Sequence, residues 1–401
     1  MPKVVLHTPE PGSSAALYVF ELLNALCEEG VAVHFICPVN HEALSKLAGN
    51  PQIEVHPTAL RSTCHSRGKL TKLRDNLRFV LSSSAVLWKT VRRRDLVHFQ
   101  YGFHIPFEMF FFASAWLRGC VIVFTAHDPL PHKWSMPSFL RWIEMGALRW
   151  MYRVSDIIMV HSEAGKRTIH EHFSEANEKV HVIAHGPYPL NTALSNPRSN
   201  RLELLFFGAL RENKGPHLAI QAVQRLYRTG VPLRLTVAGR VLNEKERDYW
   251  ERCRATIAAM PEPIHLIEEF VPEDKLPELF SGCHCLLLPY GAFYSDSGVA
   301  YLALANGKPL LATAAGGLGE LLEASKGGIL IDEATVNAVE VAIRKAAELG
   351  PDQLERMGRE GTAWVLQECG WPKVAGQTMK LYESALGMRH GALALTVEQK
   401  I

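Results

Sequence analysis

No Cys-x-x-Cys pair occurs in the sequence, although the chain contains eight cysteines. This absence excludes the common zinc-ribbon and thioredoxin-type motifs. Cys283 and Cys285 flank His284 with the alternation of a β-strand, so we expect them at the start of a buried strand and not at a metal. Unpaired cysteines of this kind are typical of a reduced compartment, and we therefore expect a cytoplasmic protein.

Long hydrophobic runs are also missing. The apolar stretch 107–117 is interrupted by Glu108 and is much shorter than the ~20 residues that a membrane span needs. The first residues contain no hydrophobic segment of the kind that a signal peptide requires. The net charge is only +2, so no overall field favours nucleic acid as a partner. We therefore expect neither a membrane-spanning protein nor a nucleic-acid-binding one.

Two nucleotide and metal motifs are absent as well. The first expected strand, residues 3–7, is not followed by Gly-x-Gly-x-x-Gly, which disfavours a dinucleotide oxidoreductase. No Asp-x-Asp motif lies in the loops that follow the strands. We therefore expect no bound metal, no cofactor and no requirement for a divalent ion.

The sequence does contain a repeated alternation of short buried strands and amphipathic helices, which predicts an α/β fold with parallel sheets. A chain of 401 residues is too long for one typical core, so two domains of roughly 150 residues or more are expected. The expected divisions are an N-terminal Rossmann-like domain (1–188), a linker rich in Pro, Asn and Ser (189–201), a C-terminal Rossmann-like domain (202–370) and a final helix (371–401).

The stretch 286–320 (LLLPYGAFYSDSGVAYLALANGKPLLATAAGGLGE) predicts strand, loop, helix, strand, loop and helix. Its first helix begins at Ser297-Gly298, where unpaired backbone N–H groups and the helix dipole would face an anion. Gly298 lacks a Cβ, so a diphosphate could approach the backbone closely. An ordinary β–α connection would have the same pattern, so this loop needs support from other motifs.

A second phosphate-site candidate follows the strand 202–207. Arg211 and Lys214 lie in the loop before a helix that begins near Pro216. Two cations beside free N–H groups form a phosphate site that needs no metal. The alternative is a pair of solvated loop charges.

Three strands of the first half end in histidine, at His127, His161 and His185. A single histidine is more often a structural hydrogen-bonding group than a catalyst. Because the carboxyl ends of parallel strands meet at one edge of a sheet, these three are expected to converge. We interpret His127 and His185 as site residues and His161 as structural.

Basic residues are concentrated in residues 61–94. This segment contains ten Lys or Arg residues and a single acid, Asp75, with two short apolar runs between its halves. A solvated helix face would explain the pattern, and so would a peripheral contact with an anionic membrane surface.

Several segments, taken in order along the chain, carry a family resemblance. They are TAHDPLPHK (125–133), VHSEAGKR (160–167), VIAHGPY (182–188), FFGALRENKG (206–215), VPEDKLPELFSGCHCLLLPY (271–290), SDSGV (295–299), GKPLLAT with a following GG (307–317) and WPKVA (371–375) with Tyr382. Together they resemble the retaining GT-B glycosyltransferases of family four, over nearly the whole chain.

The resemblance implies two Rossmann-like domains facing across a cleft, with a nucleotide sugar held mainly by the C-terminal domain and the last helix crossing back onto the first. Carried over by position, Arg211 and Lys214 would bind the donor diphosphate, and His127 would lie near the transferred sugar and the acceptor. These three are the expected catalytic residues. The expected donor-binding residues are Gly12, Ser13, His185, Gly208, Phe270, Val271, Tyr294, Asp296, Ser297, Gly298 and Val299.

The chain departs from the family pattern at two positions. Many members carry two glutamates eight positions apart, and the matching positions here are Tyr294 and Leu302. The subgroup that this chain resembles has a Ser-Gly-Val form at this loop, so we interpret the site as a variant and not as an inactive one. Asp296 is a candidate substitute for one of the acids, and the ribose-binding residue is left open.

The resemblance implies transfer of a sugar from a nucleotide-diphosphate sugar to an acceptor hydroxyl with retention of configuration. The acceptor would attack from the front face and a donor phosphate oxygen would take its proton, so His127 would position groups without acting as the base. Relatives of this kind that build surface polysaccharide or glycolipid use lipid-linked acceptors at the inner face of the plasma membrane, for which 61–94 is a candidate contact.

Two alternatives stay open at this point. One is another enzyme on the same fold, such as an epimerase or a phosphorylase, which the loss of both glutamates allows. The other is a scaffold that binds a nucleotide without turnover. The nucleotide base, the sugar, the acceptor, the linkage and the oligomeric state are not determined by the sequence.

Overall fold

The computed structural model describes residues 3–12, 14–61, 69–100, 105–131, 134, 136–190, 197, 199–242 and 246–398. The chain divides into two compact units, the first formed by Met1–Gly186 with Trp371–Ile401 and the second by Pro187–Gly370. The first unit contains a seven-stranded sheet and the second a six-stranded sheet. The expected α/β class with two Rossmann-like domains is therefore confirmed.

The first sheet has the order β3-β2-β1-β4-β5-β6-β7, with every neighbouring pair parallel. Its strands are β1 (Val4–His7), β2 (Val33–Pro38), β3 (Ile53–Thr58), β4 (Leu96–Gln100), β5 (Val121–Thr125), β6 (Ile157–Val160) and β7 (Val180–Val182). The helices are α1 (Ser14–Glu28), α2 (Leu44–Leu47), α3 (Lys69–Thr90), α4 (Ile105–Leu117), η1 (Ser138–Leu140), α5 (Arg141–Val154), α6 (Glu163–His172), η2 (Ser174–Lys179) and α13 (Trp371–Glu398).

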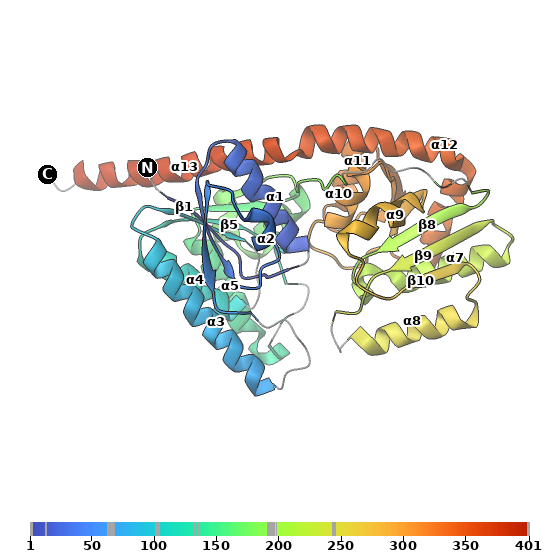
Figure 1. Cartoon of the computed structure of the whole chain (residues 1–401), viewed down its shortest axis with the longest axis horizontal. Helices are drawn as coiled ribbons and strands as arrows, with labels where there is room; N and C mark the ends of the chain where they lie inside the picture. Colours follow the sequence, from blue (N-terminus) through green and yellow to red (C-terminus); the bar gives the residue numbers. More distant parts are fainter. Residues whose placement is uncertain are drawn as a thin grey trace. The chain divides into compact units, whose positions relative to one another are not determined.

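Both faces of the first sheet are covered by helices, as expected for continuously hydrophobic parallel strands. One core contains Phe79 of α3 and Phe112 of α4, packed against β4 and β5. The other contains Leu22 of α1 and Tyr382 of α13. Figure 1 shows α3 and α4 side by side at the first sheet. The carboxyl ends of the strands are left for loops.

The second sheet has the order β10-β9-β8-β11-β12-β13, again parallel. Its strands are β8 (Leu202–Phe207), β9 (Leu233–Ala238), β10 (Ile264–Ile267), β11 (Cys285–Leu288), β12 (Leu310–Thr313) and β13 (Gly328–Ile331). The helices are η3 (Glu212–Lys214), α7 (Pro216–Arg228), α8 (Arg247–Ala259), η5 (Glu273–Lys275), α9 (Leu276–Ser281), α10 (Gly298–Ala305), α11 (Leu318–Ser325) and α12 (Val336–Cys369).

Two strand assignments from the sequence differ from the structure. The sequence did not predict β3. Its residues alternate between apolar (Ile53, Val55) and polar (Glu54, His56) over a short stretch, which is the pattern of a half-exposed edge strand. The sequence predicts a strand over 264–270, but β10 ends at Ile267, which pairs with Ala238 at the end of β9, and two glutamates follow it. By contrast, Cys283 and Cys285 are buried beside and within β11, as expected.

The chain leaves the first unit after Gly186 and returns to it at Trp371. These two positions touch, because a Cβ built on Gly186 would overlap the indole ring of Trp371. From Trp371 the chain continues as α13, which packs along α1. The last helix therefore belongs to the first unit.

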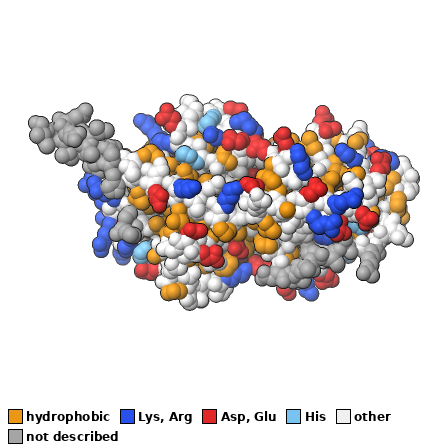
Figure 2. All heavy atoms as spheres, turned by 90° about the horizontal axis from the view of Figure 1, so that it is seen from above, with side chains coloured by type: hydrophobic (Ala, Val, Ile, Leu, Met, Phe, Trp, Pro, Cys, Tyr) orange, Lys and Arg blue, Asp and Glu red, His pale blue; other side chains and the backbone are white. Residues whose placement is uncertain are grey.

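Charge is distributed evenly over the face seen in Figure 2, where acidic and basic side chains are interspersed. Among the described residues, no helix combines the length and the apolar character that a membrane crossing requires. The segment 61–94 is less uniformly exposed than its sequence indicates. Residues 62–68 lie outside the described part of the chain, and Arg61 is buried, whereas Arg74, Arg78 and Arg92–Arg94 are exposed.

Candidate functional site in the second unit

The loop after β8 contains three predicted site residues, Gly208, Arg211 and Lys214. Gly208 has φ +129, and its N–H donates to Ala238 O at 3.0 Å, so the chain turns sharply at the end of the strand. Lys214 is buried in η3, with its Nζ 4.0 Å from the ring centroid of Tyr290. Two ring faces therefore hold this ammonium group, since Phe293 lies at 4.6 Å on the loop after β11.

Gly215 allows the loop after β8 to lie against the loop after β11. It has φ +70, and a Cβ at this position would overlap the carbonyl oxygen of Pro289. The N–H of Gly291 donates to Asn213 O at 2.9 Å across the same contact. Only glycine combines this backbone conformation with so close a backbone approach. The loops after β8 and β11 are thus joined into one rigid surface.

Arg211 has a buried guanidinium nitrogen without a protein partner. Its Nε has no hydrogen-bond acceptor within the described part of the chain, although the side chain is half-buried. A buried cationic donor left unsatisfied costs free energy, about 1–3 kcal/mol or more. Such a donor indicates a site for an anionic ligand, because an anion would supply the missing acceptor.

The start of α10 presents backbone donors. Ser297 is buried, its Oγ lies 3.3 Å from Tyr290 Oη, and its carbonyl accepts from Ala300 N at 2.8 Å. The N–H groups of Gly298 and Val299 precede this first bond, so they point out of the helix start. Val299 Cγ2 lies 3.8 Å from where a Cβ of Gly208 would be, which places this helix start beside the loop after β8.

The positions that replace the family glutamates lie in different surroundings. Tyr294 is 43% exposed, whereas Leu302 is buried in the apolar interior of α10. Asp296 is half-buried between them in the loop.

Phe270 and Val271 lie in the loop that follows β10. Phe270 is 57% exposed, and the guanidinium carbon of Arg240 lies 4.9 Å from its ring centroid. Arg240 comes directly after Gly239 at the end of β9 and was missed by sequence analysis. Its position just beyond the carboxyl end of a strand was the available signal. A stacked arginine and phenylalanine offer a surface on which a planar base could lie.

Candidate functional site in the first unit

The loop after β1 contains Gly12, whereas Ser13 lies outside the described residues. A Cβ on Gly12 would overlap the carboxylate of Glu42, whose N–H donates to Pro11 O at 2.7 Å. The loop is therefore packed closely against the chain that precedes α2, and a side chain at position 12 would require the Glu42 carboxylate to move.

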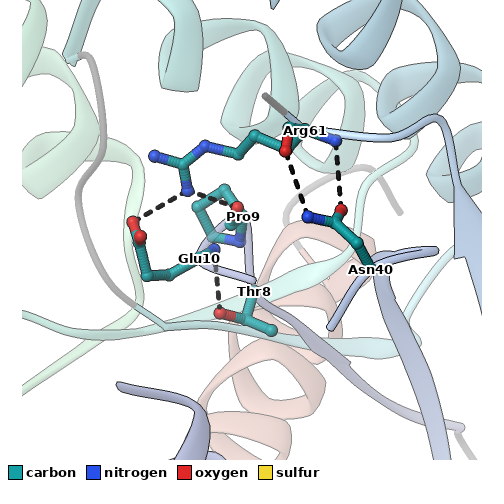
Figure 3. Close-up of polar contacts among 5 residues, drawn as sticks. All are labelled: Thr8, Pro9, Glu10, Asn40 and Arg61. Carbon is teal, nitrogen blue, oxygen red and sulfur yellow. Dashed lines mark hydrogen bonds and ion pairs between the residues drawn. The ribbon is translucent and has the colours of Figure 1, made fainter. Parts of the chain in front are cut away.

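Arg61 holds the same loop through contacts with Pro9 and Glu10 (Figure 3). Its Nη1 donates to Pro9 O and lies 2.8 Å from Glu10 Oε2. Asn40 holds the backbone of Arg61 with two hydrogen bonds, of 3.1 and 3.2 Å. The expectation that Arg61 belongs to an exposed basic segment is therefore wrong, because its charge is used inside the protein to fix the β1–α1 loop.

The three histidines at the carboxyl edge of the first sheet converge, as their strands require. His161 Nε2 lies 2.8 Å from His127 Nδ1, and His161 Nδ1 lies 2.9 Å from Ile183 O. His185 Nδ1 donates to Gly186 O at 2.9 Å. Burial lowers the pKa of His161 to about 4 and that of His185 to about 3. Burial also places the pKa of His127 well below its usual range.

The contacts extend beyond the histidines to α13. His127 Nε2 lies 2.9 Å from Gln100 Oε1, and Gln100 Nε2 lies 2.8 Å from His98 Nε2. His98 Nδ1 lies 2.6 Å from Tyr382 Oη. The sequence did not identify Gln100 and His98 as site residues, although Gln100 ends β4 at the same edge of the sheet, and it indicated Tyr382 only as part of the last helix.

The amide oxygen of Gln100 fixes the direction of these bonds. Gln100 Oε1 faces His127 Nε2 and can only accept, so His127 donates from Nε2. His127 Nδ1 then accepts from His161 Nε2. Burial favours the neutral form of the His127 ring, because it lowers the pKa well below its usual range.

Both ring nitrogens of His127 are thus engaged by protein groups. The ring of Tyr18 packs against His127, His161 and His185, with centroid distances of 4.6, 5.3 and 5.2 Å. This arrangement holds His127 in one orientation and one tautomer.

Comparisons with known proteins

Comparison with known proteins agrees with this geometry at the level of the fold. Solved structures that cover nearly the whole chain include sucrose-phosphate synthase from Thermosynechococcus elongatus, with TM-score 0.75, 17% identity and coverage of 97% of this chain and 100% of that one. Anabaena HepE in complex with UDP and glucose has TM-score 0.72 and 16% identity, covering 96% and 100%. The fold is therefore GT-B.

Two family models match the chain. The Glycosyltransferase Family 4 model matches residues 15–187, and the model described as Glycosyl transferases group 1 matches residues 192–364. Together with the fold, these matches support a GT-B glycosyltransferase.

Curated relatives match over part of their length. Glycogen synthase of Mycobacterium tuberculosis is 29% identical over 241 residues, which cover 59% of this chain and 56% of that protein. The putative colanic acid biosynthesis glycosyltransferase WcaL of Salmonella typhimurium is 26% identical over 190 residues, covering 46% and 45%. The chain thus spans about half the length of these relatives.

Proposed function

We propose that the protein transfers a sugar from a nucleotide-diphosphate sugar to an acceptor hydroxyl with retention of configuration. The observation that carries this proposal is the unpartnered, buried Nε of Arg211 on the same loop as the buried ammonium of Lys214. The outward N–H groups at the start of α10 lie beside that loop. These groups form a positive, rigid site suited to a diphosphate.

The proposed roles of these residues follow from the charge that develops on the leaving diphosphate. Breaking the bond between the sugar and the diphosphate leaves negative charge on the leaving group and an oxocarbenium-like sugar. Fixed donors that need no reorganisation stabilise such a leaving group most strongly in a site that excludes water. Arg211, Lys214 and the backbone of Gly298 supply these donors, so the proposed reaction proceeds without a divalent ion.

In this proposal the stacked Arg240 and Phe270 receive the nucleotide base. The first unit supplies the acceptor side through the loop that contains Gly12 and through His127. Both ring nitrogens of His127 are engaged by Gln100 and His161, so in this proposal it acts by positioning and is not the base. Asp296 and Tyr294 stay candidates for contacts to the sugar or ribose.

The relatives point to a biological setting in the synthesis of bacterial surface polysaccharide or glycolipid. WcaL is named for colanic acid biosynthesis, and HepE was solved with UDP and glucose. We propose a related role for this chain at the cytoplasmic side of the plasma membrane, with a lipid-linked sugar as acceptor.

The exposed face of α3 supports a membrane contact. Leu73, Leu77 and Leu81 follow one another at intervals of four residues and are 56%, 49% and 62% exposed. Arg74 and Arg78 lie next to them in the sequence and are also exposed. An exposed apolar stripe beside cations is typical of a helix that lies on an anionic lipid surface.

The donor is tested first by thermal unfolding with UDP, GDP, TDP, ADP, CMP and NAD. A ligand at about 100 times its dissociation constant adds about 2.7 kcal/mol to the unfolding free energy and raises the midpoint. We expect one nucleoside diphosphate to stabilise the protein and NAD to have no effect. Stabilisation by none of them would contradict the proposed donor site.

Product analysis then tests the reaction. With the responding nucleotide sugar and an acceptor, NMR of the new linkage should show the anomeric configuration of the donor, and activity should persist in EDTA. Binding without turnover over a broad acceptor panel would instead favour a scaffold. Conversion of the donor without an acceptor would favour an epimerase, and conversion that depends on inorganic phosphate would favour a phosphorylase.

Membrane association is tested by flotation with vesicles that contain anionic lipid. We expect the parent protein to float and a Leu77→Asp variant to float less. Leu330→Asp, at a 49% exposed leucine in the second unit, is the matched control and should float like the parent. Absence of flotation by the parent protein would remove the membrane from the proposal.

A further inference from the structure

Three potential metal ligands converge on the edge of the first sheet, outside the proposed sugar-transfer site. His34 lies on β2, and Glu54 and His56 lie on the edge strand β3. In the parallel register His34 is paired with Glu54, and Ile36 is paired with His56. Paired residues share a face of the sheet, and so do residues two apart on one strand. All three side chains therefore project from the same face.

The donor atoms lie at the separations that one metal ion requires. His34 Nδ1 is 2.9 Å from His56 Nε2 and 3.3 Å from Glu54 Oε2, and His56 Nε2 is 3.4 Å from Glu54 Oε1. A tetrahedral metal with bonds of about 2.0–2.1 Å separates its ligand atoms by about 3.3 Å. The two ring nitrogens and the Glu54 carboxylate thus lie close to the spacing of three ligands around one such ion.

The protein alone satisfies this cluster poorly. Two ring nitrogens and a carboxylate point at one another, yet a single proton between the two rings can serve only one nitrogen-to-nitrogen bond. The rings are stacked, with centroids 5.2 Å apart and an angle of 18° between their planes, so they stay close to each other and to Glu54. A cation would be coordinated by these convergent lone pairs.

The cluster is also accessible. The side chain of Glu54 is 65% exposed, and those of His34 and His56 are 16% and 22% exposed. An ion can therefore enter from solvent, and a water molecule can take the fourth position. Two imidazoles with one carboxylate are a ligand set typical of zinc and other late first-row divalent metals.

We propose that His34, Glu54 and His56 form a surface site for a divalent transition metal of the zinc class. The site lies toward the starts of β2 and β3, whereas the proposed sugar-transfer residues lie at the carboxyl ends of strands, so it is independent of the proposed reaction. A bound ion links β2 to β3 and stabilises the outermost strand, whose far side has no neighbouring strand.

The experiment uses the full chain, freed of metal with a chelator that is then removed. Isothermal titration with Zn²⁺ at neutral pH should show one site per chain, and Zn²⁺ should raise the thermal midpoint. Co²⁺ in place of Zn²⁺ should give the visible absorption of a tetrahedral ion with nitrogen and oxygen ligands.

Variants decide whether these residues hold the ion. His56→Ala and Glu54→Gln should each weaken Zn²⁺ binding by at least about tenfold and abolish the Co²⁺ spectrum. His265→Ala is the matched control, because His265 is an exposed histidine on β10, the edge strand of the other sheet, and its loss should change neither readout. Failure of the parent protein to bind Zn²⁺, or binding that survives both substitutions, would overturn the proposal. Circular dichroism establishes that each variant is folded.

Discussion

The ammonium nitrogen of Lys214 lies 4.0 Å from the ring centroid of Tyr290, on a loop that the second unit holds rigidly. In the proposed reaction this charge stabilises the departing diphosphate. We expect Lys214→Ala to lower turnover by about an order of magnitude or more without unfolding the protein. Steady-state kinetics with the identified donor measure the effect. Lys275→Ala, at an exposed lysine of η5, serves as the control, and an unchanged rate in Lys214→Ala would remove Lys214 from the site.

Arg211 should contribute mainly to donor affinity. Arg211→Gln removes the positive charge and the bidentate donor geometry, so binding of the nucleoside diphosphate should weaken by about tenfold or more. Because the buried Nε has no protein acceptor, the unliganded variant should be as stable as the parent or more stable. Titration calorimetry measures affinity, and urea unfolding measures stability. Arg228→Gln, at the exposed end of α7, is the control, and equal affinities in the two variants would contradict this role.

Gly215 and Gly230 provide a matched pair for the loop contact. Both have a left-handed backbone, with φ +70 and +80, but only a Cβ on Gly215 would overlap another atom, the carbonyl oxygen of Pro289. Gly230→Ala should cost about 1 kcal/mol of unfolding free energy from backbone strain alone. Gly215→Ala should cost about 2 kcal/mol more, because the loops after β8 and β11 must separate. Urea unfolding of both variants measures the difference, and similar losses would show that the close approach is unimportant.

The buried ion pair of Arg61 should matter far more than an exposed one. Arg61→Met leaves Glu10 and the carbonyl of Pro9 without their partner, so the unfolding free energy should fall by roughly 3–5 kcal/mol. Arg359→Met breaks an exposed pair with Glu355 and should cost less than about 1 kcal/mol. Adding Glu10→Gln to Arg61→Met should restore part of the loss. A double variant no more stable than Arg61→Met would argue against an uncompensated charge as the cause.

The buried histidines should make stability fall with acid. An unfolded histidine titrates near pH ~6.5, whereas burial lowers the pKa of His161 to about 4 and that of His185 to about 3. Between these values only the unfolded chain takes up the proton, so unfolding becomes easier as pH falls from ~6.5 toward ~4. The slope is up to about 1.4 kcal/mol per pH unit for each histidine. Urea unfolding between about pH 7 and about pH 5 measures it. A His161→Gln variant with an undiminished slope would show that His161 does not contribute.

The sequence was informative where a local signal coincided with a strand end. The strands that precede His127, Arg211 and Ser297 are mostly apolar, and the rules for parallel sheets place the loops after such strands at one edge of the sheet. That reasoning predicted the fold class and brought Arg211, Lys214 and the start of α10 together. It did not reveal Arg240, because its partner Phe270 comes from a different strand and was assigned to the strand itself.

Contacts between residues far apart in the chain could not be predicted from the sequence. Arg61 lies among exposed cations in the sequence, and only the fold brings it beneath Pro9 and Glu10. Tyr382 is separated from His98 by most of the chain, so no spacing rule connects them. The cluster of His34, Glu54 and His56 depended on recognising β3, whose short alternating pattern was overlooked.

The contact between Gly186 and Trp371 makes the second unit an insertion with adjoining ends. The first unit is interrupted at Gly186 and continues at Trp371, and these two residues are in contact. Residues 187–370 are therefore not needed to bridge a distance between them. We therefore expect the second unit to be exchangeable as a module. A short connection between Gly186 and Trp371 would preserve the course of the first unit, and a different module could be grafted at the same two positions.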